Sequence, residues 1–393
     1  MSKLQKQVQE LYLRNRRIKD GFQFTLPAPS TYPYQWFWDS CFHAIVLSHL
    51  NVEDAKKELR SVVAKQFENG MIPHMIYWEK SDLINIDWGR EGTSSLIQPP
   101  MLAHAVWTVF EKSEDKNFLE EMYAPLYHFY NYLLTERDPR GNHLAGIIHP
   151  DESGEDNSPR FDGALDLPPR HEPSLNTQKR MELVRQNASC NFDAPFCMKN
   201  FFWVKDVPFN SIFAENLRVL AKIAAKLDHK DDALKFNEQY LLVVKAMRER
   251  MVEDGLFWST YGVDYKKIKV LTWAIFAPLF AKILSHEEAQ TLVDNHLLNP
   301  KEFWTKYPVP TVAKTDPSFD PKGFWRGPTW IATNWFIYHG LMNYGMTDAA
   351  QEIKNSSLRL LQKSGFREQF DPETGEGLGA YDFTWGGLVL DMK

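Results

Sequence analysis

The sequence predicts an all-α protein, an (α/α)6 barrel in which six inner helices are ringed by six outer ones. Helical hydrophobic periodicity dominates its 393 residues, whereas strand-like alternation is scarce. The helix candidates fall into pairs with short links, and in each pair the first helix is more apolar than the second. A buried inner helix and a half-exposed outer helix are expected to differ in this way.

Twelve segments carry the helical pattern, and several have the signals that begin or end a helix. Asn51 precedes an acidic first turn, and Gly345 and Gly365 stand where C-caps are expected. The segments are 3–17, 39–50, 52–67, 97–111, 115–136, 209–227, 231–251, 271–284, 286–297, 328–344, 347–363 and 384–391. Short links predict hairpins over 39–67, 97–136, 209–251, 271–297 and 328–363.

Long links connect these hairpins and hold most of the Pro, Gly, Asp and Trp. They are 68–96, 137–208, 252–270, 298–327 and 364–383. In a toroid such links gather on one face and build a funnel-shaped site. The link 137–208 is too long for a bare loop, so we expect a cap with a short helix near 175–186. No linker divides the chain, and 1–393 is expected to form a single domain.

Composition and charge narrow the class of function. Hydrophobic residues make up 44% and aromatic residues 14% of the chain, with 13 Trp, which suits a globular core and sugar-stacking clefts. The net charge is −6 and no run of Lys or Arg stands out, which argues against nucleic acid and anionic membranes as partners. The polar, helix-patterned N-terminus does not resemble a signal peptide, and the longest apolar run, 270–281, is too short to span a bilayer.

Cysteine usage and motif content predict a cytoplasmic protein without a cofactor. Cys41, Cys190 and Cys197 form neither a CxxC pair nor a dense framework. This favours free thiols in a reducing compartment, with a Cys190–Cys197 bridge left open. No phosphate loop appears, and His286 with the two acids after it is not an HExxH motif, so no metal is expected. Homo-oligomer formation stays open.

Two acid-rich stretches, one in each half of the chain, are candidates for a catalytic site. The first, 149–159, holds several acids around Gly154, and such a loop can keep one carboxyl away from water and raise its pKa. The second, 366–385, holds Glu368 and three further acids in its first eleven residues, with interspersed glycines, and is interpreted as a structured loop. Each stretch alone could equally be a solvated surface loop.

Motif order makes the catalytic interpretation specific. The motifs are ESGEDNS at 152–158, WRGPTW at 325–330 and the stretch 366–385. Together they resemble glycoside hydrolase family 63 and the related trehalases. YPYQWFWDSCFHA at 32–44 and SSLIQPP at 94–100 are similar to the small bacterial members, the mannosylglycerate and glucosylglycerate hydrolases. The resemblance runs from about residue 30 to the end.

The resemblance implies Asp156 as the general acid and Glu368 as the general base. An inverting glycosidase needs an acid and a base roughly 6.5–9.5 Å apart, with a water between the base and the sugar. Two carboxyls from loops far apart in sequence can meet at the mouth of one toroid. We therefore expect inversion, with Asp156 protonated at rest and Glu368 ionised. The competing interpretation of Asp156 is an N-cap or turn aspartate.

The resemblance also implies a set of substrate-binding residues. These are Tyr34, Trp36, Trp38, Asp39, His74, Gln98, Trp325, Arg326, Trp330 and Trp385. Three of them have structural alternatives: Asp39 can cap a helix, His74 can be a core histidine, and Arg326 can form an internal ion pair instead of gripping a substrate or catalytic carboxylate. Relatives often have Tyr where this chain has Phe324, and Tyr381 can supply a hydroxyl.

The expected function is that of an inverting α-glycosidase acting on a small carbohydrate, with mannosylglycerate or glucosylglycerate favoured. One alternative is an α-glucosidase acting on short glucosides. Another is a sugar 2-epimerase, which would need two histidines in the mouth, and only His74 and His149 are candidates. The third is a non-catalytic glycan-binding module, which would bind sugar without turnover.

Overall fold

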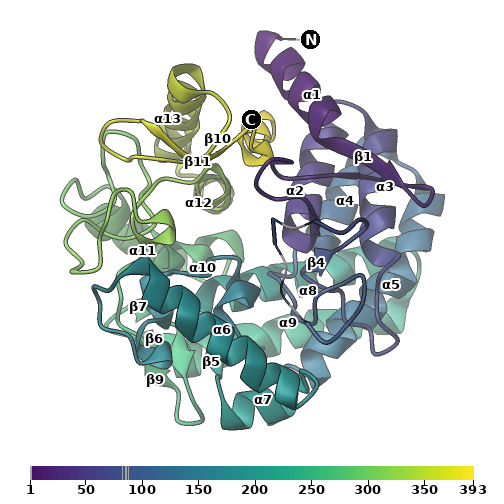
Figure 1. Cartoon of the computed structure of the whole chain (residues 1–393), viewed down its shortest axis with the longest axis horizontal. Coiled ribbons are helices and arrows are strands. Elements are labelled where there is room, and N and C mark those ends of the chain that lie inside the picture. Colours follow the sequence, from purple (N-terminus) through teal and green to yellow (C-terminus); the bar gives the residue numbers. More distant parts are fainter. Residues whose placement is uncertain (1, 82, 85, 87) are drawn as a thin grey trace.

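The computed structural model describes residues 2–81, 83–84, 86 and 88–393, and their helices close into a ring (Figure 1). The inner members are α2 (Phe37–Ser48), α4 (Leu102–Ser113), α8 (Val207–Lys226), α10 (Ala277–Phe280), α12 (Ile331–Asn343) and the 3-10 helix η7 (Thr384–Leu390). Each packs on the next in this order, and η7 packs back on α2. The described part of the chain thus confirms the predicted (α/α)6 barrel.

The outer helices alternate with the inner ones along the chain. They are α1 (Lys3–Asn15), α3 (Val52–Val63), α5 (Lys116–Thr135), α9 (Lys230–Met251), α11 (His286–Leu292) and α13 (Thr347–Ser364). The helix α3 packs on α2, α5 on α4, α9 on α8 and α13 on α12, as the short links predict. The helix α1 packs on η7, so the first and last segments of the chain complete the ring.

The contrast between the two layers follows from burial. Every residue of α2 is buried, because inner neighbours and an outer helix surround it. The outer helix α3 buries one face and begins at Asn51, whose side chain accepts hydrogen bonds from the N–H groups of Glu53 and Asp54. One hydrophobic cluster extends from Val8 to Met392. This shared core supports our proposal that 1–393 is a single domain.

Three predicted helices are shorter or tighter than the periodicity indicates. Over 271–284 the chain forms the 3-10 helix η4 (Trp273–Phe276) and then α10, and a positive φ of 56° at Lys282 prevents further helix. The helix α11 gives way to a π-helical turn at Val293–Leu297. The predicted helix at 384–391 is the 3-10 helix η7, whose paired glycines allow close approach to neighbouring segments.

The cap within 137–208 contains more structure than the single helix predicted. It includes 3-10 helices at Pro150–Ser153 (η1), Pro159–Phe161 (η2) and Gly163–Leu165 (η3), and the helices α6 (Pro173–Ser189) and α7 (Ala194–Asn200). Its last strand, β5 (Val204–Lys205), pairs with β8 (Thr260–Tyr261), which pairs with β9 (Lys266–Lys267). Figure 1 shows α6 passing in front of the lower side of the ring, with α7 at the lower edge of the molecule. The helix α6 is central to the site described below.

Although strand-like alternation is scarce in the sequence, the structure contains a tight β-hairpin near the N-terminus. Strands β1 (Arg16–Lys19) and β2 (Phe22–Thr25) form an antiparallel pair. Asp20 and Gly21 join them with φ values of 50° and 82°, which is the Asp-Gly turn that favours two-residue hairpins. The helical pattern up to residue 17 concealed this signal.

The stretch 366–385, predicted as a loop, also contains a hairpin. Strands β10 (Arg367–Phe370) and β11 (Gly377–Tyr381) pair antiparallel, with a register irregularity between Arg367 and Gln369. Further two-residue strands form the pairs β3 (Gln35–Trp36) with β4 (Met75–Ile76), and β6 (Val252–Glu253) with β7 (Leu256–Phe257). The hairpin matters for function because it carries Glu368.

Two further predictions concern thiols and membranes. All three cysteines are free, and the Sγ atoms of Cys190 and Cys197 lie 2.7 Å apart without a bond between them. Among the helices of the described residues, none combines the length and the apolar character needed to cross a bilayer.

Candidate active site

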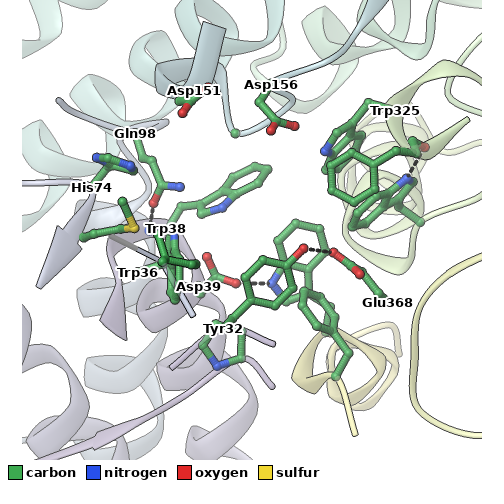
Figure 2. Close-up of a pocket in the computed structure, with 18 of the residues that line it drawn as sticks. Tyr32, Trp36, Trp38, Asp39, His74, Gln98, Asp151, Asp156, Trp325 and Glu368 are labelled. Carbon is green, nitrogen blue, oxygen red and sulfur yellow. Dashed lines mark hydrogen bonds between the residues drawn. The ribbon is translucent and has the colours of Figure 1, made fainter. Parts of the chain in front are cut away.

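Four of the long links, 68–96, 137–208, 298–327 and 364–383, together with the segment 27–39, line most of an open cavity of about 780 Å³, its mouth included. All predicted site residues line this cavity except Tyr34 and Arg326. The lining also includes Tyr32, Asp151, Arg180, Phe324 and Phe383, together with Pro27, Met75, Ile84, Ile86 and Gly154. Figure 2 shows Asp156 and Glu368 facing the cavity from different sides, with aromatic rings between them.

The local fold determines which acids of the upstream loop reach the cavity. Glu152 forms a buried ion pair with Arg137 at 2.7 Å. Glu155 is likewise buried and bonds Arg160 at 3.0 Å. These two acids stabilise the loop from the inside, so that only Asp151 and Asp156 of its acids line the cavity.

Gly154 separates those two aspartates and is required by the packing. Its φ is +74°, and a Cβ there would lie 2.4 Å from the ring of Trp38. Only glycine lets the loop pass this closely over the indole. The turn at Gly154 therefore fixes both carboxyls above Trp38.

Asp156 has the environment of a carboxyl that retains its proton. Burial raises its pKa above the ordinary value, while Arg180, whose Nη2 lies 2.7 Å from Oδ2, opposes this rise. The negative charge of Asp151 raises the pKa further. The direction of this shift is the one a general acid needs.

Glu368 is placed by the β10–β11 hairpin and by contact with the N-terminal segment. Its Oε1 accepts a 2.5 Å hydrogen bond from the Tyr32 hydroxyl, and its Oε2 accepts one from the Ala380 N–H at 2.8 Å. A Cβ on Gly379 would lie 2.3 Å from Oε2, so this position also requires glycine. Burial raises the pKa of Glu368 to about 7, and both hydrogen bonds act against that rise.

The other acids of this stretch stay away from the cavity. Asp371 accepts hydrogen bonds from the N–H groups of Glu373 and Thr374 and so fixes the turn. Glu373 pairs with Lys314 and Glu376 with Lys322, at 2.6 and 2.8 Å. The surface interpretation is therefore correct for Glu373 and Glu376, whereas Asp371 is buried in the turn and Glu368 faces the cavity.

Asp39 lies at the floor of the cavity, in the first turn of α2. Its Oδ1 accepts a 2.8 Å hydrogen bond from the Trp385 Nε1–H. Burial raises its pKa to about 6, although His43 and the Trp385 bond favour the charged form. A buried carboxylate with one oxygen still facing the cavity can accept hydrogen bonds from sugar hydroxyls.

Indole rings form much of the wall. Trp325 and Trp330 stack face to face with centroids 3.8 Å apart and planes at 4°. Trp38 meets Trp385 edge to face at 5.1 Å. Packed rings of this kind are rigid and present flat apolar faces on which the C–H face of a sugar can lie.

Two neutral polar side chains complete the floor. Gln98 accepts a hydrogen bond from the Trp38 N–H at 3.1 Å, which turns its amide nitrogen toward the cavity (Figure 2). His74 Nδ1 lies 2.6 Å from the Ser94 hydroxyl. Because burial lowers the pKa of His74 to about 3, the ring is neutral at physiological pH and can act as a hydrogen-bonding group.

Comparison with known proteins agrees with this geometry. The family model described as "Mannosylglycerate hydrolase MGH1-like glycoside hydrolase domain" matches residues 32–386.

The chain belongs to this family of glycoside hydrolases.

Among the relatives of this glycoside hydrolase, the mannosylglycerate hydrolase of Thermus thermophilus is 33% identical, over 93% of this chain and 95% of the relative. A glucosylglycerate hydrolase of Mycolicibacterium hassiacum is 29% identical, over 95% of each protein. A crystal structure of the family 63 mannosylglycerate hydrolase from Thermus thermophilus, in complex with Tris and D-glycerate, superposes with a TM-score of 0.91. That structure is 31% identical, and the match covers 99% of both chains.

Tyr34 is not part of the cavity of this glycoside hydrolase, contrary to the prediction. Its hydroxyl donates to the main-chain oxygens of Ser81 and Ile84, and its ring packs on Tyr77 with centroids 4.4 Å apart. Tyr34 therefore lies behind Trp36 and anchors the adjacent loop. Tyr32, two residues earlier, occupies the cavity wall instead.

Arg326 likewise does not line the cavity, contrary to the prediction. Its guanidinium donates two hydrogen bonds to Asp162, at 3.0 and 2.7 Å, and one to the Asn157 main-chain oxygen at 3.2 Å. These bonds direct the guanidinium away from the cavity. The internal ion pair, one of the alternatives considered from sequence, is the interpretation that holds. Arg326 fastens the loop after Asp156 to the WRGPTW segment.

Three polar residues of the cavity were not predicted from the sequence. Tyr32 lies inside the motif at 32–44, and nothing local distinguishes it from Tyr34. Asp151 precedes the ESGEDNS motif and resembles any other loop acid. Arg180 lies in the cap helix α6, whose position over the ring no periodicity reveals. What these three residues share is that the fold brings them to one cavity, and this can be seen only in the folded chain.

The Tyr32–Glu368 contact makes a testable prediction about pH dependence. In Tyr32→Phe the carboxylate loses a donor, so the pKa of Glu368 should rise above its value of about 7. Since the base must be ionised, the acidic limb of the kcat/KM profile should move to higher pH by roughly one unit, as expected for a hydrogen bond to a charged group. Tyr34→Phe is the matched control and should leave this limb in place. An unchanged acidic limb in Tyr32→Phe would contradict the assignment of Glu368 as the base.

Proposed function

We propose that this glycoside hydrolase inverts the anomeric configuration of a small α-glycoside whose aglycone is glycerate, with mannose or glucose as the sugar. The proposal depends mainly on one observation: Asp156 and Glu368, from opposite halves of the chain, face one small cavity from different sides (Figure 2). The cavity that both line, about 780 Å³ with its mouth included, is large enough for a sugar ring and a water. Apart from Asp151, which also lines the cavity, the other acids of both stretches do not line it, which supports these two as the acting pair.

The reaction follows from this arrangement. Asp156 donates its proton to the glycosidic oxygen as the bond from that oxygen to the anomeric carbon breaks, and the bonding electrons stay on the oxygen. Glu368 removes a proton from a water that attacks the anomeric carbon from the opposite face. Tyr32 and the Ala380 N–H hold Glu368 in one orientation throughout. Return of a proton from Glu368 to Asp156 through solvent completes the cycle.

The neighbouring side chains suit binding of a single sugar ring. Asp39 and Gln98 offer an acceptor and a donor for hydroxyls at the floor, and His74 adds a neutral hydrogen-bonding group. Trp38, Trp325 and the other indoles supply faces for stacking. Mannose and glucose differ in the orientation of one hydroxyl, and the binding groups named here do not select between the two orientations. Both sugars are therefore compatible with the cavity.

The charge of the cavity does not by itself assign the aglycone. Arg180 is the arginine among the described residues that line it, no lysine lines it, and its guanidinium already bonds Asp151 and Asp156. The proposal of a carboxylate-bearing aglycone therefore depends on the relatives. The relatives named as mannosylglycerate and glucosylglycerate hydrolases, and the related crystal structure with bound D-glycerate, support glycerate as that group.

The epimerase alternative lacks its second histidine. His74 lines the cavity, but His149 is fully buried, with Nε2 facing the Arg180 main-chain oxygen at 3.0 Å and Nδ1 accepting from the Asp151 N–H. A histidine acid–base pair on the sugar is therefore not formed by the lining residues that the structure describes.

A substrate panel followed by proton NMR tests the proposal. The panel contains α-mannosylglycerate, α-glucosylglycerate and the matching glycosides of glycerol, which keep the size of the aglycone but lack its carboxylate. We expect glycerate release with the β-anomer of the sugar appearing first, and markedly slower cleavage of the glycerol glycosides. Initial release of the α-anomer would refute inversion, and faster cleavage of the neutral glycosides would refute the glycerate assignment. An epimer without cleavage would favour an isomerase, and tight binding without turnover a binding module.

A further inference from the structure

The cavity holds a charged triad formed by Asp151, Arg180 and Asp156. Arg180 Nη2 lies 2.7 Å from Asp151 Oδ1 and 2.7 Å from Asp156 Oδ2, and its Nε donates to Asp151 Oδ1 at 2.8 Å. The two aspartates flank Gly154 in the upstream loop, whereas Arg180 reaches them from the cap helix α6. All three side chains are mostly buried, with 13–27% of each exposed. One guanidinium thus serves two carboxyls.

Arg180 by itself conflicts with the role of Asp156. A general acid must keep its proton at the working pH, yet a guanidinium in contact with a carboxyl favours the ionised form and lowers its pKa by about 1–3 units. Some other group has to offset the charge of Arg180. Asp151 is placed to do so, since it receives bonds from two nitrogens of the guanidinium and Asp156 from one.

The surroundings shift the pKa values of the two aspartates in opposite directions. Burial acts to raise the pKa of Asp151, but its charged neighbours, Arg180 foremost, outweigh it and hold that pKa well below its ordinary value. For Asp156, burial outweighs Arg180, and the charge of Asp151 adds to the rise in pKa. Arg180 and the two carboxyls together are neutral when only one carboxyl is ionised, and the His149 Nδ1 beside them accepts the Asp151 N–H and so carries no proton in that contact. The contacts favour the state in which Asp151 is ionised and Asp156 carries the proton.

We propose that Asp151 is a positioning residue for catalysis: its carboxylate neutralises Arg180, and this allows Asp156 to keep the proton that it donates to the leaving oxygen. The inference rests on the proposed role of Asp156 as the acid. Once that proton has moved to the glycosidic oxygen, Asp156 becomes a carboxylate beside Arg180, which stabilises the charge just formed. The triad therefore holds the proton before the reaction and stabilises its loss during the reaction.

The remaining groups around Asp156 do not replace Asp151. His149 lies on the same loop and contacts Asp151 through Nδ1 at 3.2 Å. His74, from the facing segment, is neutral because burial lowers its pKa to about 3. Glu368, Tyr32 and Asp39 face Asp156 across the cavity and act on it only at longer range. Of these groups, Asp151 is the one in direct ion-pair contact with Arg180.

The decisive variant is Asp151→Asn, which keeps the shape and removes the charge. Arg180 then has Asp156 as its sole carboxylate partner, so the pKa of Asp156 should fall. The basic limb of the kcat/KM profile for the glycoside cleaved best should move to lower pH by about 1–3 units. Cleavage of the corresponding α-glycosyl fluoride, whose leaving group needs little protonation, should lose much less. Asp151→Glu, which keeps the charge, should leave the basic limb near its wild-type position.

A double variant separates charge balance from a structural role. In Asp151→Asn/Arg180→Met both charges are absent, so the basic limb should return toward its wild-type position even if the rate stays low. A merely structural Asp151 would lower the rate without moving the limb in Asp151→Asn. An unmoved limb, or a limb that moves to higher pH, would overturn the inference.

Failure of the proposed function can be told apart from failure of the triad. Carboxyl-carbon NMR of protein labelled with ¹³C-aspartate follows the titration of Asp156 without any substrate, with Asp156→Asn identifying its signal. A lower pKa of Asp156 in Asp151→Asn than in wild type supports the charge balance even if glycerate glycosides are not cleaved. Equal values in the two proteins would refute it, whatever the substrate proves to be.

Discussion

Glu368→Gln should reduce kcat for the best glycoside substrate by about 10²–10⁴-fold, the usual contribution of a general base. Glutamine preserves the shape and can still accept from Tyr32, but it cannot take a proton from water. KM should change little, because the role proposed for Glu368 is to act on the water and the floor of the cavity is intact. Steady-state kinetics at the pH optimum measures both constants. Glu376→Gln is the matched control, since Glu376 pairs with Lys322 at the surface and should leave kcat unchanged.

Stability measurements exclude unfolding as the cause of this loss. Burial raises the pKa of Glu368 from 4.5 to about 7, so its neutral form stabilises the fold and that contribution is lost as pH rises through 7. Glutamine never ionises, so Glu368→Gln should be more stable than wild type above pH 7, by up to about 3 kcal/mol. Thermal unfolding at pH 5 and pH 8 tests this sign. A variant that stays active, or one destabilised at pH 8, would count against a buried base at this position.

Asp156→Asn should have the second large effect, and one that depends on the leaving group. Asparagine cannot protonate the glycosidic oxygen, so hydrolysis of a glycerate or glycerol glycoside should fall by about 10²–10⁴-fold. The α-glycosyl fluoride of the same sugar should be hydrolysed at a rate much closer to wild type, because fluoride departs with little protonation. Comparing the two substrates on one enzyme preparation makes the test independent of enzyme concentration.

Asp166→Asn is the matched control for this second variant. Asp166 is exposed ten positions further along and has a φ of 55°, which asparagine adopts readily. It should behave as wild type with both substrates. An equal loss of glycoside and fluoride hydrolysis in Asp156→Asn would indicate a damaged cavity instead of a missing acid. Full activity on glycosides would require a different proton donor.

Much of the fold could be predicted because it depends on local pattern. The all-buried helix α2 and the half-buried helix α3 differ in hydrophobic periodicity, and Asn51 marks the boundary between them. The order of the helical hairpins along the chain then predicts the ring of inner and outer helices. The hairpin at Asp20-Gly21 is equally local, but the helical pattern before it extends two residues beyond the end of α1 and hides the first strand.

The candidate site could be predicted only in part. Motif order pointed to Asp156 and Glu368, and the structure places both at the cavity. The same motifs could not separate Tyr32 from Tyr34, because the two have the same chemistry and lie two residues apart. Nor could they choose among the partners of Arg326, since Asp162 is far from it in sequence.

The sequence alone thus determined an α/α toroid and the two acidic stretches at its mouth, since helical periodicity and motif order are properties of neighbouring residues. Only the tertiary structure decided which carboxyls line the cavity, which tyrosine bonds Glu368 and that Arg180 lies between Asp151 and Asp156. Those outcomes depend on contacts between segments that are distant along the chain. Such contacts are determined by the packing of the whole ring, so they cannot be predicted from any short segment of the sequence.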